Sequence, residues 1–209
     1  DEKYVVHIPF VGDYQCANVL AAISTLAQLD FSLEQLCQFS ETLTLPEGRF
    51  ERIENAMGID IVVDYAHTPD AMKQILQAVK KQARQRVIVV FSCGGNRDRE
   101  KRPKMGMIAS IYANYIVLTT DNARNESPKA INAQIQQGFS STQIFTEVLD
   151  RKQAIFAALN EADEGDTVVI LGKGHEKTQQ IGNVQSDFSD KECVLEFLNN
   201  KQQQQINDN

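Results

Sequence analysis

Four polar segments of the sequence carry the side chains with the clearest capacity for chemistry. Each comes directly after a short apolar run and combines glycine, carboxamide or charged residues. Glycine lets the backbone turn sharply and approach a ligand closely, while arginine and lysine bind carboxylate or phosphate groups. Each segment alone also fits an ordinary solvated loop, but four in succession favour one shared site. The segments are Asp64–Asp70, Ser92–Pro103, Thr119–Pro128 and Gly172–Glu176.

The first segment, Asp-Tyr-Ala-His-Thr-Pro-Asp, predicts the start of a helix. Thr68 can cap that helix, with Pro69 in its first position. Asp64 and His67 would then face the mouth of a sheet, near a helix N-terminus that favours phosphate. The alternative is a capped helix with one surface histidine.

The second segment places two glycines, Gly94 and Gly95, before the charged run Arg97 to Arg102. Basic side chains on a loop that precedes a helix suit a carboxylate or a phosphate. A glycine-rich loop is weak evidence by itself, and a solvated loop is the alternative.

The apolar runs before these segments predict the scaffold that positions them. The runs are rich in β-branched residues, and stretches with helical spacing separate them. Continuous apolar strands that alternate with amphipathic helices indicate an α/β fold, with a Rossmann-like, mostly parallel sheet and helices on both faces. Ligands bind beyond the carboxyl ends of such strands, where the four segments lie. The predicted strands are Ile59–Val63, Val87–Phe91, Tyr115–Thr119 and Thr167–Leu171.

The two ends of the chain differ from this pattern. Residues 18–29 and 33–39 are predicted helices, with Ser32 as the N-cap of the second and Gln35 three residues later. Pro46-Glu47-Gly48 is a turn-like break, so we expect residues 1–47 to end one domain and Gly48 to begin the next. Residues 199–209 are polar and rich in glutamine, and we predict a disordered tail without function.

The composition restricts the classes of partner. The chain has 209 residues, 42% of them hydrophobic, which is enough to bury a core. The 21 basic and 28 acidic residues give a net charge of −7, which disfavours nucleic acid and anionic membranes as partners. Four cysteines without a CxxC pair indicate a reducing, cytoplasmic location. Because the first residue is Asp1 rather than methionine, we expect a fragment or a processed product.

Taken in order, the four segments resemble the C-terminal domain of the MurE-type ligases. The matching motifs are Asp-Tyr-Ala-His-Thr-Pro-Asp, Gly-Gly-Asn-Arg-Asp, Asp-Asn-Ala-Arg and Gly-Lys-Gly-His-Glu. Gly48-Arg49-Phe50-Glu51 resembles the start of that domain, and Gly12–Asn18 resembles the segment that closes the central ATP-binding domain. The resemblance covers residues 8–198 and departs at Gln15, where asparagine is usual, and at Ala123, where proline is usual.

The resemblance implies a domain division and an activity. Residues 1–47 would end the central ATP-binding domain, and residues 48–198 would form the amino-acid-binding domain. The implied reaction joins meso-diaminopimelate to UDP-MurNAc-L-Ala-D-Glu through an acyl phosphate, with ATP and Mg²⁺. The family's phosphate loop, Gly-Thr-x-Gly-Lys-Thr, does not occur in these residues, and neither does the region with its magnesium ligands. Catalytic and metal-binding residues are therefore expected outside this chain.

The resemblance also implies contacts for individual residues. An arginine that clamps the distal carboxylate of diaminopimelate would be left unpaired by lysine, so Arg124 favours diaminopimelate. Glu176 can pair with the ligand's ammonium group. The implied ATP contacts are Asn18, Arg49, Asp64 and His67, and the implied amino-acid contacts are Arg97, Asn122, Arg124, Gly172 and Glu176.

Other functions fit parts of the same pattern. One is an L-lysine-adding ligase of the same type, and another is a related ligase such as folylpolyglutamate or cyanophycin synthetase. A third is a non-catalytic Rossmann-like module that binds an amino acid. A phosphate loop in the sequence that precedes residue 1 would favour a ligase over the module.

We predict that the purified 209-residue chain neither forms an amide bond nor hydrolyses ATP. The reason is that phosphoryl transfer needs a phosphate-binding loop and magnesium ligands, which we expect elsewhere. The measurement is phosphate release and product formation with ATP, UDP-MurNAc-L-Ala-D-Glu and meso-diaminopimelate. Product formation by the purified chain would contradict this prediction.

Overall fold

The chain forms two compact units in the computed structural model, which describes residues 3–207, with the side chains of residues 205–207 excepted. The first unit ends at Pro46 and the second begins at Glu47. This division falls one residue before the boundary predicted from the sequence.

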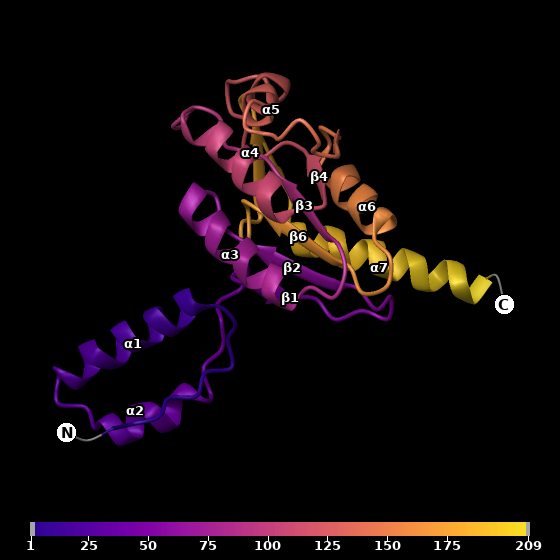
Figure 1. The fold of residues 1–209 in the computed structure, drawn as a ribbon. Helices are drawn as coiled ribbons and strands as arrows, with labels where there is room; N and C mark the ends of the chain where they lie inside the picture. The colour runs from indigo at the N-terminus through magenta and orange to yellow at the C-terminus, as the bar shows by residue number, and fades with distance from the viewer. Residues whose placement is uncertain (1–2, 208–209) are drawn as a thin grey trace. The chain divides into compact units, whose positions relative to one another are not determined.

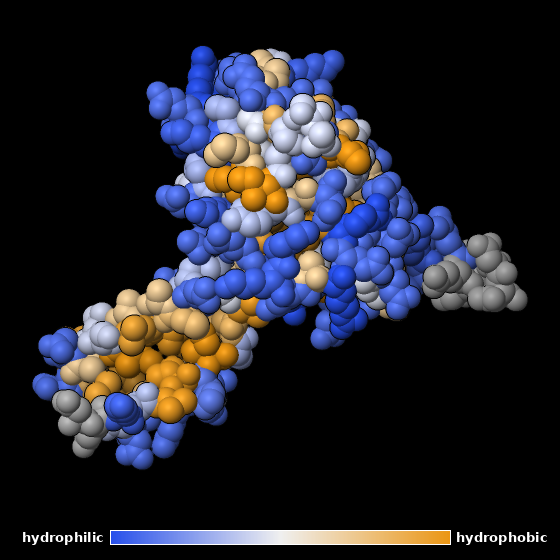
Figure 2. All heavy atoms as spheres, in the orientation of Figure 1, coloured by the Kyte–Doolittle hydropathy of each residue, from blue (hydrophilic) through white to orange (hydrophobic). Residues whose placement is uncertain are grey.

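The first unit contains two helices, α1 (Asp13–Ala27) and α2 (Leu33–Ser40). Helix α1 begins five residues earlier than predicted, directly after Gly12. Gly12 has a φ of 105°, which glycine adopts more readily than other residues. Ser32 is the N-cap residue of α2 as predicted, but its side chain makes no capping hydrogen bond. Apolar side chains remain on the surface of this unit, as Figure 2 shows. The most exposed of them are Val5, Phe39, Leu20, Leu29 and Phe31.

The second unit is built on a six-stranded sheet with the order β1-β2-β6-β3-β4-β5 (Figure 1). All neighbouring strands are parallel except β1, which is antiparallel to β2. The predicted mostly parallel α/β fold is therefore confirmed. The strands are β1 (Glu51–Arg52), β2 (Asp60–Asp64), β3 (Val87–Phe91), β4 (Tyr115–Leu118), β5 (Phe145–Glu147) and β6 (Thr167–Leu171).

Helices cover both faces of this sheet. Helices α6 and α7 pack on one face over a core that includes Ile61, Ile88 and Ile170. Helix α4 packs between α3 and α5, and these three helices cover the other face (Figure 1). None of the helices in residues 3–207 is long and apolar enough to cross a membrane. The helices are α3 (Pro69–Gln82), α4 (Lys101–Tyr112), α5 (Pro128–Gln136), α6 (Arg151–Glu161) and α7 (Asp190–Asn207).

Helix α7 corrects the prediction of a disordered tail, because residues 199–207 continue this helix. Its first half is anchored in the core, where the ring of Phe197 lies 5.3 Å from that of Phe156. The Nζ of Lys201 lies 5.6 Å from the centroid of the Phe197 ring. An anchored helix propagates easily into glutamine and lysine, which are good helix formers. Residues 208–209 lie outside the described residues.

A two-stranded hairpin follows β6 and was not predicted. It consists of β7 (Thr178–Ile181) and β8 (Val184–Asp187), with Gly182 in the turn at a φ of 60°. The strand residues are mostly polar, so they lack the apolar alternation that identifies a strand in a sequence.

A fully buried ion pair joins the two helices on the α6–α7 face. The guanidinium group of Arg151 donates to both carboxylate oxygens of Asp190, at 2.7 and 2.8 Å. It also donates to the backbone oxygen of Leu171, at 2.9 Å. Burial without a partner is costly for a charge, so each member of this pair depends on the other.

We predict that Asp190→Asn lowers the free energy of unfolding by about 3–5 kcal/mol, because it leaves the Arg151 charge buried and uncompensated. The matched control is Glu196→Gln, which breaks the Lys152–Glu196 pair between the same two helices. That pair is half exposed and should contribute about 0–1 kcal/mol. Urea unfolding followed by circular dichroism measures both variants. Equal losses in the two variants would contradict the structural role of the buried pair.

Candidate functional site

A cavity of about 460 Å³ lies at the carboxyl ends of β2, β3, β4 and β6. A larger cavity of about 550 Å³ lies at the opposite end of β2 and β6, beside Asp60 and Thr167. Parallel sheets bind ligands at the carboxyl ends, so we assign the site to the first cavity. Six of the nine residues predicted to contact ligands line it, namely His67, Arg97, Asn122, Arg124, Gly172 and Glu176.

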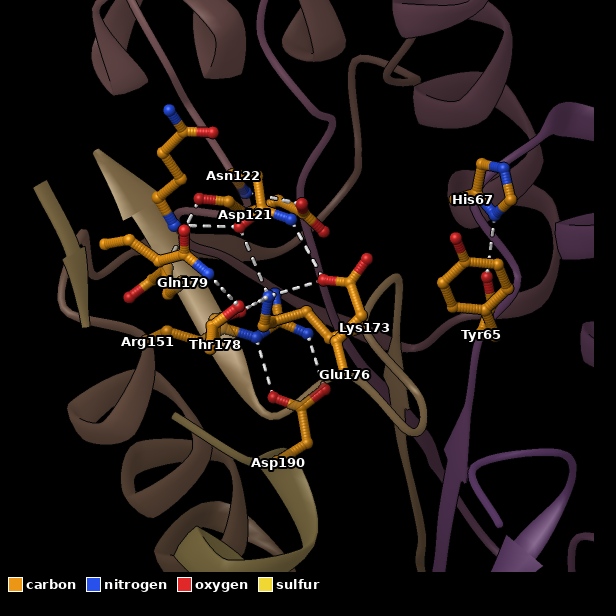
Figure 3. Close-up of polar contacts among 12 residues, drawn as sticks. Tyr65, His67, Asp121, Asn122, Arg151, Lys173, Glu176, Thr178, Gln179 and Asp190 are labelled. Atoms are coloured by element: carbon orange, nitrogen blue, oxygen red, sulfur yellow. Dashed lines mark hydrogen bonds and ion pairs between the residues drawn. The ribbon is translucent and has the colours of Figure 1, made fainter. Parts of the chain in front are cut away.

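The loop after β2 has the predicted helix start. Thr68 is the N-cap of α3 and accepts a hydrogen bond from the Ala71 N–H at 3.3 Å, and Pro69 is the first helical residue. The ring of His67 lies 4.6 Å from that of Tyr65, edge to face (Figure 3). The Tyr65 ring also lies 5.1 Å from that of His175. Of these three residues, Tyr65 and His67 line the cavity and form an aromatic wall of the site.

Asp64, a predicted ATP contact, is not among the residues that line the cavity. Its carboxylate is buried and accepts the N–H groups of Phe50, at 2.7 Å, and Ala66, at 2.6 Å. Burial raises the pKa of this carboxyl group, and the two backbone hydrogen bonds oppose that rise. Asp64 thus ties the start of the second unit to the end of β2.

Arg49 and Asn18, two further predicted ATP contacts, are not among the residues that line the cavity. Arg49 is exposed, and its guanidinium carbon lies 4.7 Å from the centroid of the Tyr65 ring. This is a cation–π distance, so Arg49 borders the aromatic wall. Asn18 belongs to α1 of the first unit, where its amide lies 3.4 Å from the side-chain oxygen of Gln15.

A polar network joins the loops after β4 and β6 (Figure 3). The side-chain amide of Asn122 donates to Oε2 of Glu176 at 2.9 Å. The ammonium group of Lys173 donates to the same oxygen at 2.7 Å. Asn122 and Glu176, both predicted to bind the amino acid, are thus held in contact by a lysine that the sequence reasoning missed. Lys173 is 0% exposed. A lysine between two glycines in a sequence gives no indication that its side chain is buried.

The two predicted arginines both lie close to Gly94. A Cβ atom at Gly94 would lie 3.1 Å from Nη1 of Arg124 and 3.8 Å from Cγ of Arg97. Nη1 of Arg124 donates to the backbone oxygen of Gly95 at 2.8 Å, which orients this guanidinium group. Neither arginine has a carboxylate partner within the described residues. Both positive charges are therefore available to an anionic ligand.

At Gly172 the backbone passes close to the carboxylate of Asp121. Its φ is 115°, and a Cβ atom there would lie 2.6 Å from Oδ2 of Asp121. Asp121 is buried and lines the cavity, although sequence reasoning did not single it out. Its place in the Asp-Asn-Ala-Arg motif is the signal that could have identified it.

The charged run Arg97 to Arg102 contains residues that line the cavity and one arginine that is fully buried. Arg102 is fully buried and makes two 3.0 Å contacts with the Glu126 carboxylate. Hydrogen bonds from Arg102 lower the pKa of Glu126 to about 2. This pair fastens α4 to the loop after β4, so Arg102 is not available to a ligand.

Comparison with known proteins shows which family this chain resembles. Residues 48–174 match the family model described as Mur ligase, glutamate ligase domain. A UDP-N-acetylmuramoyl-L-alanyl-D-glutamate–2,6-diaminopimelate ligase from Lawsonia intracellularis is 42% identical over 199 residues, which are 95% of this chain and 41% of the relative. The ligase of the same name from Clostridioides difficile is 41% identical over 198 residues, covering 93% of this chain and 40% of the relative.

Solved structures agree with these relatives. A 2,6-diaminopimelate ligase of the same name superposes with a TM-score of 0.73 at 38% identity, over 95% of this chain and 41% of that one. A pseudomurein peptide ligase from Methanothermus fervidus superposes with a TM-score of 0.67 at 23% identity, over 83% of this chain and 36% of that one, and shows the fold alone. The chain spans about two fifths of the length of the curated relatives named above.

We predict that Gly172→Ala lowers the free energy of unfolding by about 1–3 kcal/mol more than Gly182→Ala. Both glycines have positive φ, so both variants strain the backbone. Only at position 172 does the new methyl group also meet the Asp121 carboxylate, whereas nothing lies within 4 Å at position 182. Urea unfolding of the two variants gives the difference, and equal losses would mean that Asp121 moves away without cost.

Proposed function

The chain belongs to the Mur ligase family, with the glutamate ligase domain at residues 48–174, and we propose that it is the amino-acid-binding part of an ATP-dependent ligase. The proposed reaction adds meso-diaminopimelate to UDP-MurNAc-L-Ala-D-Glu. The observation that carries this proposal is the pair of unpaired arginines in one cavity with the Glu176 carboxylate.

Meso-diaminopimelate carries two carboxylates and two ammonium groups. Arg124 and Arg97 match the two carboxylates, and a guanidinium group can bind a carboxylate through two parallel hydrogen bonds. Glu176 matches an ammonium group, with Asn122 beside it. Lysine lacks the distal carboxylate, so it would leave one arginine unpaired in the site, and unpaired polar groups discriminate strongly between substrates.

The chain's own residues would hold the amino acid so that its amine meets the activated carboxylate with water excluded. In the proposed arrangement, His67 and Arg49, beside Tyr65, form an edge for the nucleotide. Asn18 stays a predicted ATP contact in the first unit. ATP supplies the phosphoryl group that activates the carboxylate. Magnesium is assigned no residue, because the described part of the chain has no group of three His, Cys, Asp or Glu side chains placed to hold a metal.

A binding titration of the chain with meso-diaminopimelate, L-lysine and L-glutamate tests the substrate class. We expect meso-diaminopimelate to bind most tightly, because it alone of the three satisfies both arginines and Glu176. Tightest binding of lysine would favour a lysine-adding ligase, and tightest binding of glutamate would favour a folylpolyglutamate-type ligase.

We predict that Arg124→Ala lowers kcat/KM for meso-diaminopimelate by about ten- to a hundredfold in a full-length ligase that carries this chain. Hydrogen bonds to a charged group contribute roughly 1.5–3 kcal/mol, and about 1.4 kcal/mol corresponds to a factor of ten. The use of lysine should change far less, because lysine has no distal carboxylate.

The matched control is Arg99→Ala, an exposed arginine on the neighbouring loop that does not line the cavity. It should leave kcat/KM for both amino acids close to the wild-type values. Equal losses for both substrates in Arg124→Ala would mean that this arginine serves the shared α-carboxylate or the structure, and the preference for diaminopimelate would lose its support.

A further inference from the structure

Lys173 is a fully buried cation in contact with Asn122 and Glu176, two residues that line the cavity, and the function proposed above gives it no role. Its ammonium group lies 2.7 Å from Oε2 of Glu176, 2.7 Å from the backbone oxygen of Thr178 and 3.4 Å from Oδ1 of Asn122. A lysine ammonium has three N–H donors and no acceptor, so three acceptors satisfy it completely. Glu176, its ion-pair partner, keeps 30% of its side chain exposed.

The burial of this charge makes its contacts obligatory. A buried ammonium group without partners is very unfavourable. The three acceptors of Lys173 are therefore held within hydrogen-bond distance of its ammonium group. One acceptor is a backbone oxygen at the start of β7, which is fixed by the hairpin. The other two acceptors are side chains of residues that line the cavity.

This arrangement decides which way the Asn122 amide points. A side-chain amide has an oxygen that accepts and a nitrogen that donates, and the two orientations have nearly the same shape. Oδ1 receives the Lys173 ammonium and, at 2.9 Å, the backbone N–H of Gln180. Nδ2 is therefore directed to Glu176, where it donates at 2.9 Å (Figure 3).

The same contacts occupy one carboxylate oxygen of Glu176 and leave the other available to a ligand. Oε2 receives both Lys173 and Asn122. No hydrogen bond within the described residues falls on Oε1. The free oxygen of a carboxylate whose position is fixed is well suited to accept a ligand's ammonium group.

We infer that Lys173 is a positioning residue of the amino-acid pocket: it fixes the Asn122 amide and presents Oε1 of Glu176 to the ammonium group of the bound amino acid. This inference rests on the proposed function. Lys173 also neutralises the charge of Glu176. A ligand therefore binds most tightly when it carries carboxylates for the two arginines as well as ammonium groups.

The test is steady-state kinetics of Lys173→Met in a full-length ligase that carries this chain. Methionine keeps an unbranched side chain and removes the three donors. We expect KM for the amino acid to rise about tenfold or more, since charge-assisted hydrogen bonds have energies of that order. KM for ATP and for UDP-MurNAc-L-Ala-D-Glu should stay within about twofold, because the contacts of Lys173 lie among residues assigned to the amino acid.

Lys177→Met is the matched control. Lys177 follows in the same loop and also pairs with a glutamate, at 2.5 Å from Oε1 of Glu47, but it is exposed and does not line the cavity. Its substitution should leave all three KM values unchanged. Lys173→Arg keeps the charge beside Glu176 with a different donor geometry, so it provides a second measurement if the methionine variant does not fold. Its KM for the amino acid should lie between those of the wild type and Lys173→Met.

A rise confined to the amino-acid KM in Lys173→Met or Lys173→Arg supports the inference. Wild-type KM values in both variants would overturn it, as would equal rises for all three substrates, which indicate a general structural role. A wild-type ligase that uses no amino acid with its UDP-sugar substrate would instead refute the proposed function. That result appears before any variant is compared, so the two failures are distinguishable.

Discussion

The insertion of β6 between β2 and β3 is the constraint on which the rest of the structure depends. In the parallel register Asp64 lies opposite Leu171, and Val90 lies opposite Ile170, so the three strands end at the same level. All five residues of β6 are buried, as expected for a strand covered on both faces. Segments more than a hundred residues apart in the sequence therefore become neighbours only when the last parallel strand is in place, and the cavity forms with it.

The end of β6 also explains why two cations are buried in this small region. Arg151 donates to the backbone oxygen of Leu171, the last residue of β6, and pairs with Asp190. Lys173 lies two residues after Leu171 and pairs with Glu176. Buried ion pairs contribute little net stability compared with apolar packing, but removal of one partner is strongly unfavourable. Such pairs therefore fix one conformation of the loop after β6, which is what a binding loop requires.

The sequence predicts the core of this fold better than its margins. The predicted bounds of β3 and β6 agree with the structure to the residue, because strands buried on both faces are continuous β-branched runs. The edge strands β1 and β5, of two and three residues, and the polar β7–β8 hairpin leave no such signal. The helical end of α7 was missed because its anchoring contacts lie elsewhere in the chain. In the site, six of the residues predicted to contact ligands line one cavity, and their ligand contacts stay predictions. Asp64, Asp121 and Lys173 each have a neighbour far along the chain, at Phe50, Gly172 and Asn122, which no local pattern encodes.

The hairpin shows why a polar segment without a local signal still matters for the site. The side chain of Gln179 donates to the backbone oxygen of Thr120, and the backbone of Gln180 donates to Asn122. The backbone N–H of Arg124 donates to Gln180 at 3.2 Å, and its oxygen accepts from Gly182 at 2.7 Å. On its other side the same loop receives the N–H of Gly95, through the oxygen of Asn122. A loop that is hydrogen-bonded along both sides loses little conformational entropy when a ligand arrives, so the binding energy of the arginine and asparagine side chains is not spent on ordering the loop.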